Sequence, residues 1–163
     1  MLRWILAVLV AVAVGCAHVE KPPREVGLAI WDIEPLFVGV PPESMPPKEF
    51  LANEMVRAAE EVGGFRVVER ERLLKVLEEL HLGSSELAEE STRLRLGKLV
   101  GARYMLFSSY QAVGGRLRFD LRLVDVETGV VKAAVHKTMP LGQWEDSLRA
   151  IYKLTQDLLS KGR

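Results

Sequence analysis

Residues 116–123 read RLRFDLRL, and this stretch decides the fold class of the chain. Charged and apolar side chains alternate strictly along it, with leucine or phenylalanine at every second position. Because successive side chains of a β-strand point to opposite faces of a sheet, this period predicts a strand with one buried face and one wet face.

The segments on either side of this strand predict an antiparallel meander. Gly114 and Gly115 precede the strand and form a two-residue hairpin turn, since both can take positive φ. Before that turn, residues 102–110 contain the apolar run YMLF, which is typical of a central strand covered on both faces. After it, residues 127–129 (ETG) form a second turn and residues 130–138 return as a third strand.

The rest of the chain alternates between strand and helix patterns. Strands are expected at 26–33 and 65–69, and helices at 46–62, 70–82, 91 to about 100, and 142–160. The predicted order is therefore β-α-β-α-α-β-β-β-α. We expect a single α/β (α+β) domain, with a mixed sheet of about five strands and helices packed against it.

The proline-rich segment 35–47 is predicted to be a loop, and it is a candidate interaction site. Apolar side chains stand between its prolines, so the loop either exposes them at low entropic cost or folds back over the core as a lid. A tryptophan that opens the last helix is a further candidate, although packing is the alternative reading at such a position. The candidate interaction residues are Leu36, Phe37, Val38, Val40 and Trp144.

The first residues of the chain are typical of an exported protein. Arg3 provides a basic start, residues 4–14 form an uninterrupted apolar run, and Gly15 precedes Cys16, the only cysteine. This is the order of basic, apolar and small residues in a signal peptide, which we predict to be residues 1–15. Even extended to residue 17, the apolar helix would cover roughly 21 Å against a hydrocarbon core of about 30 Å, which favours cleavage.

Cys16 is the predicted site of lipid attachment. Residues 13–16 read AVGC and resemble the lipobox of bacterial lipoproteins, whose cysteine becomes the new N-terminus and carries acyl chains. Each buried methylene contributes about 0.8 kcal/mol, so several chains on one cysteine would make a durable anchor. The resemblance also implies the outer membrane, because Ala17 stands where an aspartate marks inner-membrane retention. An incidental cysteine behind an ordinary signal peptide and an uncleaved anchor are the alternatives.

The expected mature chain is a lipidated cysteine with a short tether, residues 16–25, followed by a periplasmic domain, residues 26–160. The chain has 22 basic and 22 acidic residues, and loss of the signal peptide removes only Arg3 from this balance. Such a balance provides no basic face for nucleic acid. Binding to nucleic acid is therefore not expected.

No motif in the sequence argues for an enzyme, a metal or a cofactor. The three histidines, at 18, 81 and 136, are isolated, and none has the spacing of a zinc site. Phosphate-binding and dinucleotide-binding glycine patterns are absent from the sequence. Asp32 and Glu34 share one face of the first strand, but charges at strand ends are usually solvated. We therefore expect no catalytic residues, no metal site and no cofactor.

Three segments together resemble a known family. They are 65–77 (FRVVERERLLKVL), 96–104 (LGKLVGARY) and 121–129 (LRLVDVETG). Their order and spacing behind a lipobox resemble the CsgG-like group of envelope lipoproteins. This group includes the curli secretion lipoprotein, LpoB-type activators of penicillin-binding proteins and, more remotely, the N-terminal domain of TolB. The resemblance covers residues 26–138.

The resemblance implies a non-catalytic lipoprotein on the periplasmic face of the outer membrane. It would act as an accessory or adaptor in envelope assembly or secretion, through contacts with other envelope proteins and with a lipid anchor in the membrane. An oligomeric component of a secretion channel and an activator of peptidoglycan synthases are the alternatives. A homo-oligomer is compatible with each of these functions.

Overall fold

The computed structural model describes residues 25–37, 41, 44–80 and 89–162, which form one mixed α/β domain. Its strands are β1 (Val26–Ile30), β2 (Glu34–Phe37), β3 (Phe65–Val67), β4 (Tyr104–Val113), β5 (Arg116–Asp125) and β6 (Val131–Pro140). Its helices are α1 (Lys48–Val62), α2 (Arg70–Glu79), α3 (Glu90–Leu99) and α4 (Trp144–Lys161). The predicted fold class is confirmed, and the order of elements differs from the prediction only by the additional strand β2.

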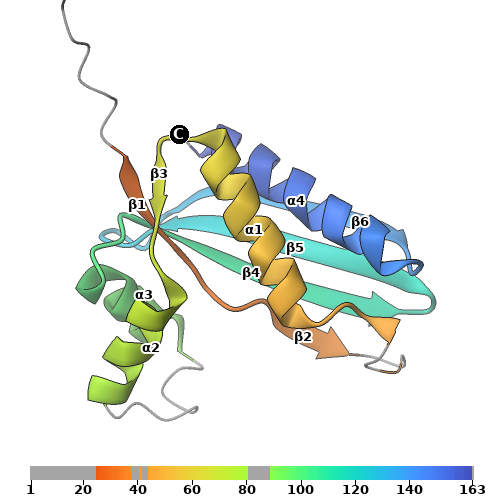
Figure 1. Cartoon of the computed structure of the whole chain (residues 1–163), viewed down its shortest axis with the longest axis horizontal. Helices are drawn as coiled ribbons and strands as arrows, with labels where there is room; N and C mark the ends of the chain where they lie inside the picture. The colour runs from red at the N-terminus through yellow and green to blue at the C-terminus, as the bar shows by residue number, and fades with distance from the viewer. Residues whose placement is uncertain (1–24, 38–40, 42–43, 81–88, 163) are drawn as a thin grey trace, which may run out of the picture.

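All six strands belong to one sheet (Figure 1). Five of them run in the order β3-β1-β4-β5-β6, and β2 pairs with β4 outside this order. Strand β1 is parallel to β3 and to β4, whereas β4, β5 and β6 form the predicted antiparallel meander. The turn glycines have the expected backbone conformations, with φ of 56° at Gly114, 72° at Gly115 and 70° at Gly129. Both turns therefore lie where the sequence predicted them, and each joins two long antiparallel strands.

Strand β2 corrects the prediction that residues 35–47 are a loop. Residues Glu34–Phe37 pair in parallel with β4, beyond the point at which β1 ends. Proline is tolerated here because β2 pairs only with β4 among the described strands, so Pro35 needs no N–H on its outer side. Of the remaining residues of the segment, Val38 and Val40 lie outside the part of the chain that the structure describes.

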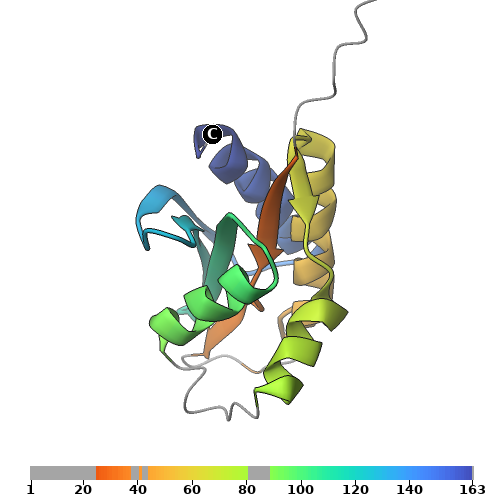
Figure 2. The ribbon, with the colours of Figure 1, turned by 90° about the vertical axis from the view of Figure 1, so that its left-hand side faces the viewer.

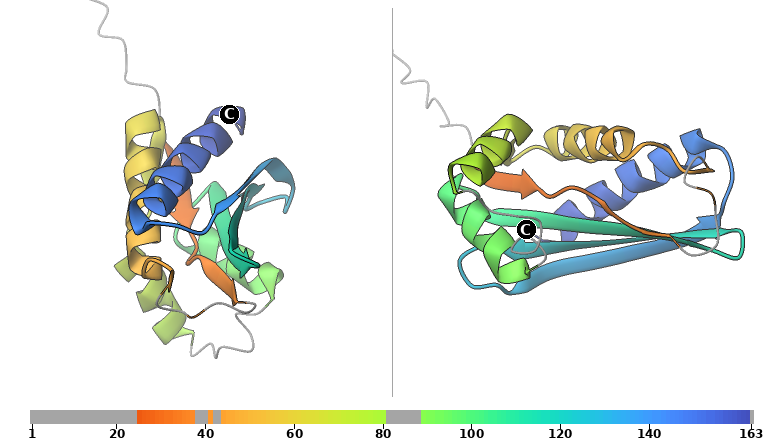
Figure 3. Two further views of the ribbon diagram at one scale, coloured as in Figure 1. Left: turned by 90° about the vertical axis from the view of Figure 1, so that its right-hand side faces the viewer. Right: turned by 90° about the horizontal axis from the view of Figure 1, so that it is seen from below.

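Helices α1 and α4 cover one face of the sheet, and the main core lies between them and the strands (Figure 3). The alternation in β5 predicted this core, since Leu117, Phe119, Leu121 and Leu123 are all at most 2% exposed. Both helices start at the end of the sheet where the β4–β5 turn lies, so they run in the same direction (Figure 1). We call this side the helix-covered face.

The opposite side of the sheet is covered only in part. Helices α2 and α3 lie together below β1 in Figure 2, over a smaller core that includes Leu73, Met105 and Val124. Beyond this core, none of the described helices covers this side of the second half of β4 or of the first half of β5. We call this uncovered area the open face, and the candidate interaction surface lies on it.

The β5–β6 turn is held by Asp125, whose side chain is buried. Its carboxylate accepts hydrogen bonds from the backbone N–H groups of Glu127 (3.1 Å) and Thr128 (3.0 Å) and pairs with Arg103 at 2.7 Å. Burial by itself raises the pKa of Asp125, but the hydrogen bonds from the turn and the charge of Arg103 outweigh burial and lower this pKa. The ionised form of Asp125 therefore stabilises the fold.

Replacing Asp125 with alanine is expected to lower the free energy of unfolding by about 2–3 kcal/mol at pH 7, because two N–H groups and a guanidinium lose their acceptor. Since the folded pKa lies below the unfolded value of about 3.9, this contribution is complete above that value. It disappears as the pH falls through the folded pKa, so the difference between wild type and variant should shrink. Urea unfolding at pH 7 and pH 3 measures this change.

Glu127 provides the matched control for this substitution. It pairs with the same Arg103 at 2.6 Å, but its side chain is 67% exposed. Exposed ion pairs contribute about 0–1 kcal/mol, so Glu127→Ala should cost much less than Asp125→Ala. Equal losses for the two variants would contradict the role assigned to Asp125.

Candidate interaction surface

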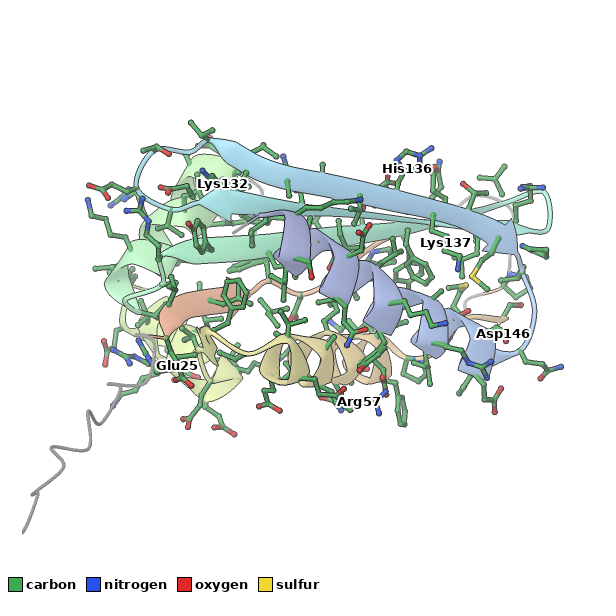
Figure 4. The ribbon with its side chains drawn as sticks, turned by 90° about the horizontal axis from the view of Figure 1, so that it is seen from above. Glu25, Arg57, Lys132, His136, Lys137 and Asp146 are labelled. Carbon is green, nitrogen blue, oxygen red and sulfur yellow. The ribbon has the colours of Figure 1, made fainter. Side chains whose placement is uncertain are left out.

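The open face consists of alternate residues from the meander. In β5 these are the polar positions of the RLRFDLRL pattern, and the strand register places residues of β4, β6 and β2 beside them. The same alternation appears in Figure 4, where His136 points away from α4 and Lys137 lies on the side of α4. The surface comprises Leu36, Ser109, Gln111, Val113, Arg116, Arg118, Asp120, Arg122, Ala134, His136 and Thr138.

A cavity of about 290 Å³ opens on this face where the strands meet α3. Its lining includes Glu34, Arg93, Phe107, Arg122 and His136. Sites for small molecules usually measure about 300–1,000 Å³ and are mostly apolar. This cavity is at the lower limit of that range and is lined by charged groups, so it fits one side chain of a partner better than a cofactor.

Two arginines lie near the same aromatic ring at the edge of the cavity. The guanidinium carbon of Arg122 lies 5.1 Å from the ring centre of Phe107, and that of Arg93 lies 6.0 Å from the same ring. Arg93 also lies 5.6 Å from the ring centre of Trp31. A cation at such a distance from the face of an aromatic ring is attracted to the ring, so the rings help to position the two guanidinium groups.

Carboxylates fix the same arginines. Arg93 forms an ion pair with Glu34 of β2, and its side chain is only 13% exposed. Arg122 pairs with Glu90, the first residue of α3, at 2.7 Å. The charged groups of the cavity are therefore ordered before any partner binds, which lowers the entropic cost of binding.

Further along β5, Arg118 and Asp120 form a two-point contact, with nitrogen–oxygen distances of 2.8 and 2.6 Å. The hydrogen bond to Asp120 raises the pKa of Arg118, so its guanidinium stays charged. Asp120 also lies directly across from His136 on β6. The open face thus carries groups of both charges, together with the exposed apolar side chains of Leu36 and Val113.

The structure separates the interaction residues that the sequence predicted. Leu36 is 53% exposed and shares the open face, because it pairs with Gln111 of β4. Trp144 is 41% exposed, but it begins α4 on the helix-covered side of the sheet. Phe37 is the last residue of β2, whereas Cys16, Val38 and Val40 lie outside the described residues. The candidates therefore do not form one patch.

Sequence reasoning missed the aromatic and arginine cluster around Phe107. The alternation in β5 showed that Arg118 and Arg122 face water, but α3 carries no pattern that would place Arg93 beside them. Among the described residues, no group of three or more histidine, cysteine, aspartate or glutamate side chains could hold a metal ion. None of the described helices has both the length and the apolar composition required to cross a bilayer.

Comparisons with known proteins relate this fold to one group. The family model of the curli production assembly/transport component CsgG matches residues 48–117, from the start of α1 into β5. The resemblance to CsgG-like proteins that the sequence predicted is confirmed. No curated protein matches the sequence at a significant level.

Solved structures of envelope proteins share the fold. The C-terminal domain of LpoB from Salmonella enterica is 21% identical with a TM-score of 0.59, over 74% of this chain and 87% of that one. Lipoprotein GNA1162 from Neisseria meningitidis is 11% identical with a TM-score of 0.55, over 83% and 96%. A PelC dodecamer from Paraburkholderia phytofirmans is 15% identical with a TM-score of 0.50, over 85% and 89%. At these identities the likeness shows a common fold.

Proposed function

From this CsgG-like fold, we propose that the protein is a non-catalytic lipoprotein of the bacterial outer membrane that acts as a periplasmic adaptor through protein contacts. The open face is the observation that carries the proposal. One side of the sheet is buried under α1 and α4, whereas the other leaves Arg118, Arg122 and the apolar side chains of Leu36 and Val113 accessible. Arginine and aromatic residues dominate the binding energy of protein interfaces.

The chemistry of the open face supports a protein as the partner. Glu34, Glu90 and Asp120 pair with three of its four arginines, so the net positive charge of the face is too small to favour a polyanion. Its cavity fits a side chain, and the flat meander around it fits a larger surface. Mixed charges in fixed positions favour a partner with a complementary pattern, which provides specificity more than affinity.

The sequence of the N-terminus supports the location. A signal peptide at residues 1–15, acylation of Cys16 and Ala17 in the next position would place the domain on the periplasmic face of the outer membrane. The domain would then start about nine residues after the anchor. An envelope protein that approaches the membrane could reach the open face.

Crosslinking in cells tests the open face as the contact surface. A photoreactive amino acid at Thr138, which is exposed on the open face, is expected to form adducts with an envelope protein. The matched control is Lys153, which is exposed on α4 on the helix-covered side. Adducts from both positions in equal yield, or from Lys153 alone, would contradict the open face as the contact surface. Mass spectrometry of the adduct identifies the partner.

A role as an oligomeric secretion component is a second candidate. It is supported by the match to the CsgG model and by the shared fold with a PelC dodecamer. Strand β6 is ten residues long and pairs only with β5 among the described strands, so its outer edge could pair with a neighbouring copy. Light scattering of the detergent-extracted protein separates the two candidates, because a monomer excludes a ring.

An activator of peptidoglycan synthases is a third candidate, supported by the fold shared with the C-terminal domain of LpoB. With a tether of about nine residues, the synthase would have to come close to the membrane that holds the anchor. A synthase in the Thr138 adduct would support this function, and its absence among all adducts would exclude it.

A further inference from the structure

Three exposed apolar side chains stand at the end of the domain where the described chain begins. Leu99, the last residue of α3, is 58% exposed, and Val130 and Val131 after the β5–β6 turn are 57% and 48% exposed. Two adjacent valines exposed to water do not contribute the favourable free energy that burial of apolar surface provides. Binding to a surface that covers them would provide this free energy.

Backbone hydrogen bonds bring these residues to the start of β1. The N–H of Arg103, in the loop after α3, donates to Gly27 of β1 at 2.8 Å. The carbonyl of the same Arg103 accepts from Val126, which leads into the β5–β6 turn, at 3.0 Å. Figure 4 shows the same arrangement, because the labelled residues Glu25 and Lys132 lie at the same end of the domain.

Charged groups surround the apolar residues. Lys98 and Lys132 are exposed and stand next to Leu99 and Val131 in the chain. The guanidinium group of Arg103 is already ion-paired, with Asp125 at 2.7 Å and with Glu127 at 2.6 Å. Lysine side chains beside apolar residues suit the boundary between acyl chains and phosphates, since the stem stays in the apolar layer while the ammonium group reaches the headgroups.

We propose that this end of the domain docks on the lipid surface, with Leu99, Val130 and Val131 in the boundary between headgroups and acyl chains. The inference rests on the proposed lipid anchor at Cys16. Glu25 is the ninth residue after Cys16, so the fully extended tether spans at most about 32 Å. Within this reach the lipid surface is at a high effective concentration, so even weak contacts fix the orientation.

This docking would orient the open face for its partner. The strands of the meander run from the docked end to the β4–β5 turn, where α1 and α4 also start (Figures 1 and 3). The turn would point into the periplasm, and the open face would stand upright beside the membrane. A partner could approach it from the side without displacing lipid.

Fluorescence quenching by lipids tests the orientation. The lipidated protein is reconstituted in vesicles of phosphatidylethanolamine and phosphatidylglycerol, with or without bromine on the acyl chains. Val130→Trp is compared with Val113→Trp, an exposed valine beside the turn at the far end. The signal of the wild type, which contains Trp31 and Trp144, is subtracted.

Val130→Trp is expected to lose about half of its added fluorescence in brominated vesicles, because interfacial groups enter about 5–10 Å into the boundary. Val113→Trp should lose none. Leu99→Trp provides a second probe if the first variant does not fold. Equal quenching at the two ends overturns docking while the anchor stands. Intact mass shows the acyl chains independently, and a protein without them removes both the anchor and the inference.

Discussion

Gly27→Ala is expected to lower the free energy of unfolding by about 3 kcal/mol, at the upper end of the usual cost of overpacking. A Cβ atom at Gly27 would lie 2.6 Å from the carbonyl oxygen of Gly101 and 3.2 Å from the Cα of Ala102. Both are backbone atoms, so no side-chain rotation relieves the clash. The same loop donates a hydrogen bond to Gly27 of β1 and accepts one from Val126 before the β5–β6 turn, so the whole end of the sheet would have to shift.

Other glycines provide controls for the stability measurement. Gly142 has open space around its Cβ position and no positive φ, so Gly142→Ala should leave the free energy of unfolding nearly unchanged. Gly114 also has open space, but its φ of 56° makes Gly114→Ala cost about 1 kcal/mol. Urea unfolding of the three variants should give this ranking. A Gly27→Ala variant as stable as Gly142→Ala would show that β1 and the loop after α3 are not in tight contact.

The sequence predicted the meander well because its signals are local. Strict alternation in β5, paired glycines at 114–115 and the turn at 127–129 each depend only on neighbouring residues. The structure confirms both turns and the buried set on β5. Helices were predicted within two or three residues where apolar periodicity was clear, as for α1 and α4.

Strand β2 could not be predicted, because its reason lies elsewhere in the chain. Its proline and its glutamate are typical of a loop, and pairing with residues 109–112 of β4 overrides that preference. The position is available only because β1 stops after pairing with residues 104–106. A local pattern carries no information about where another strand ends.

The candidate surface was predicted only in part for a similar reason. Alternation showed which residues of β5 face water, but the absence of a covering helix is a property of the assembled fold. Arg93 comes from α3 and Glu34 from β2, 59 positions apart, and their ion pair exists only after both elements pack on β4. The sequence predicts both Leu36 and Trp144 as interaction residues, but in the structure the sheet lies between them.

Cys16→Ala is expected to remove the protein from the outer-membrane fraction and to abolish its acyl mass. The cysteine thiol is the only group in the chain that can accept the lipid, because the sequence has no other cysteine. A single acyl chain binds membranes only marginally, whereas several chains on one residue hold a protein durably. Density-gradient fractionation and intact mass of wild type and variant measure the two effects.

Ala17→Asp separates anchoring from sorting. As the resemblance to lipoproteins implies, this variant is expected to keep its acyl mass but to move to the inner membrane, because an aspartate after the cysteine marks retention there. The open face would then be carried to the opposite membrane on the same tether of about nine residues, out of reach of a partner that works at the outer membrane. Loss of the Thr138 adduct in Ala17→Asp would therefore place the partner at the outer membrane. An adduct that survives in both locations would show that the partner spans the periplasm, and an unlipidated wild type would contradict the anchor itself.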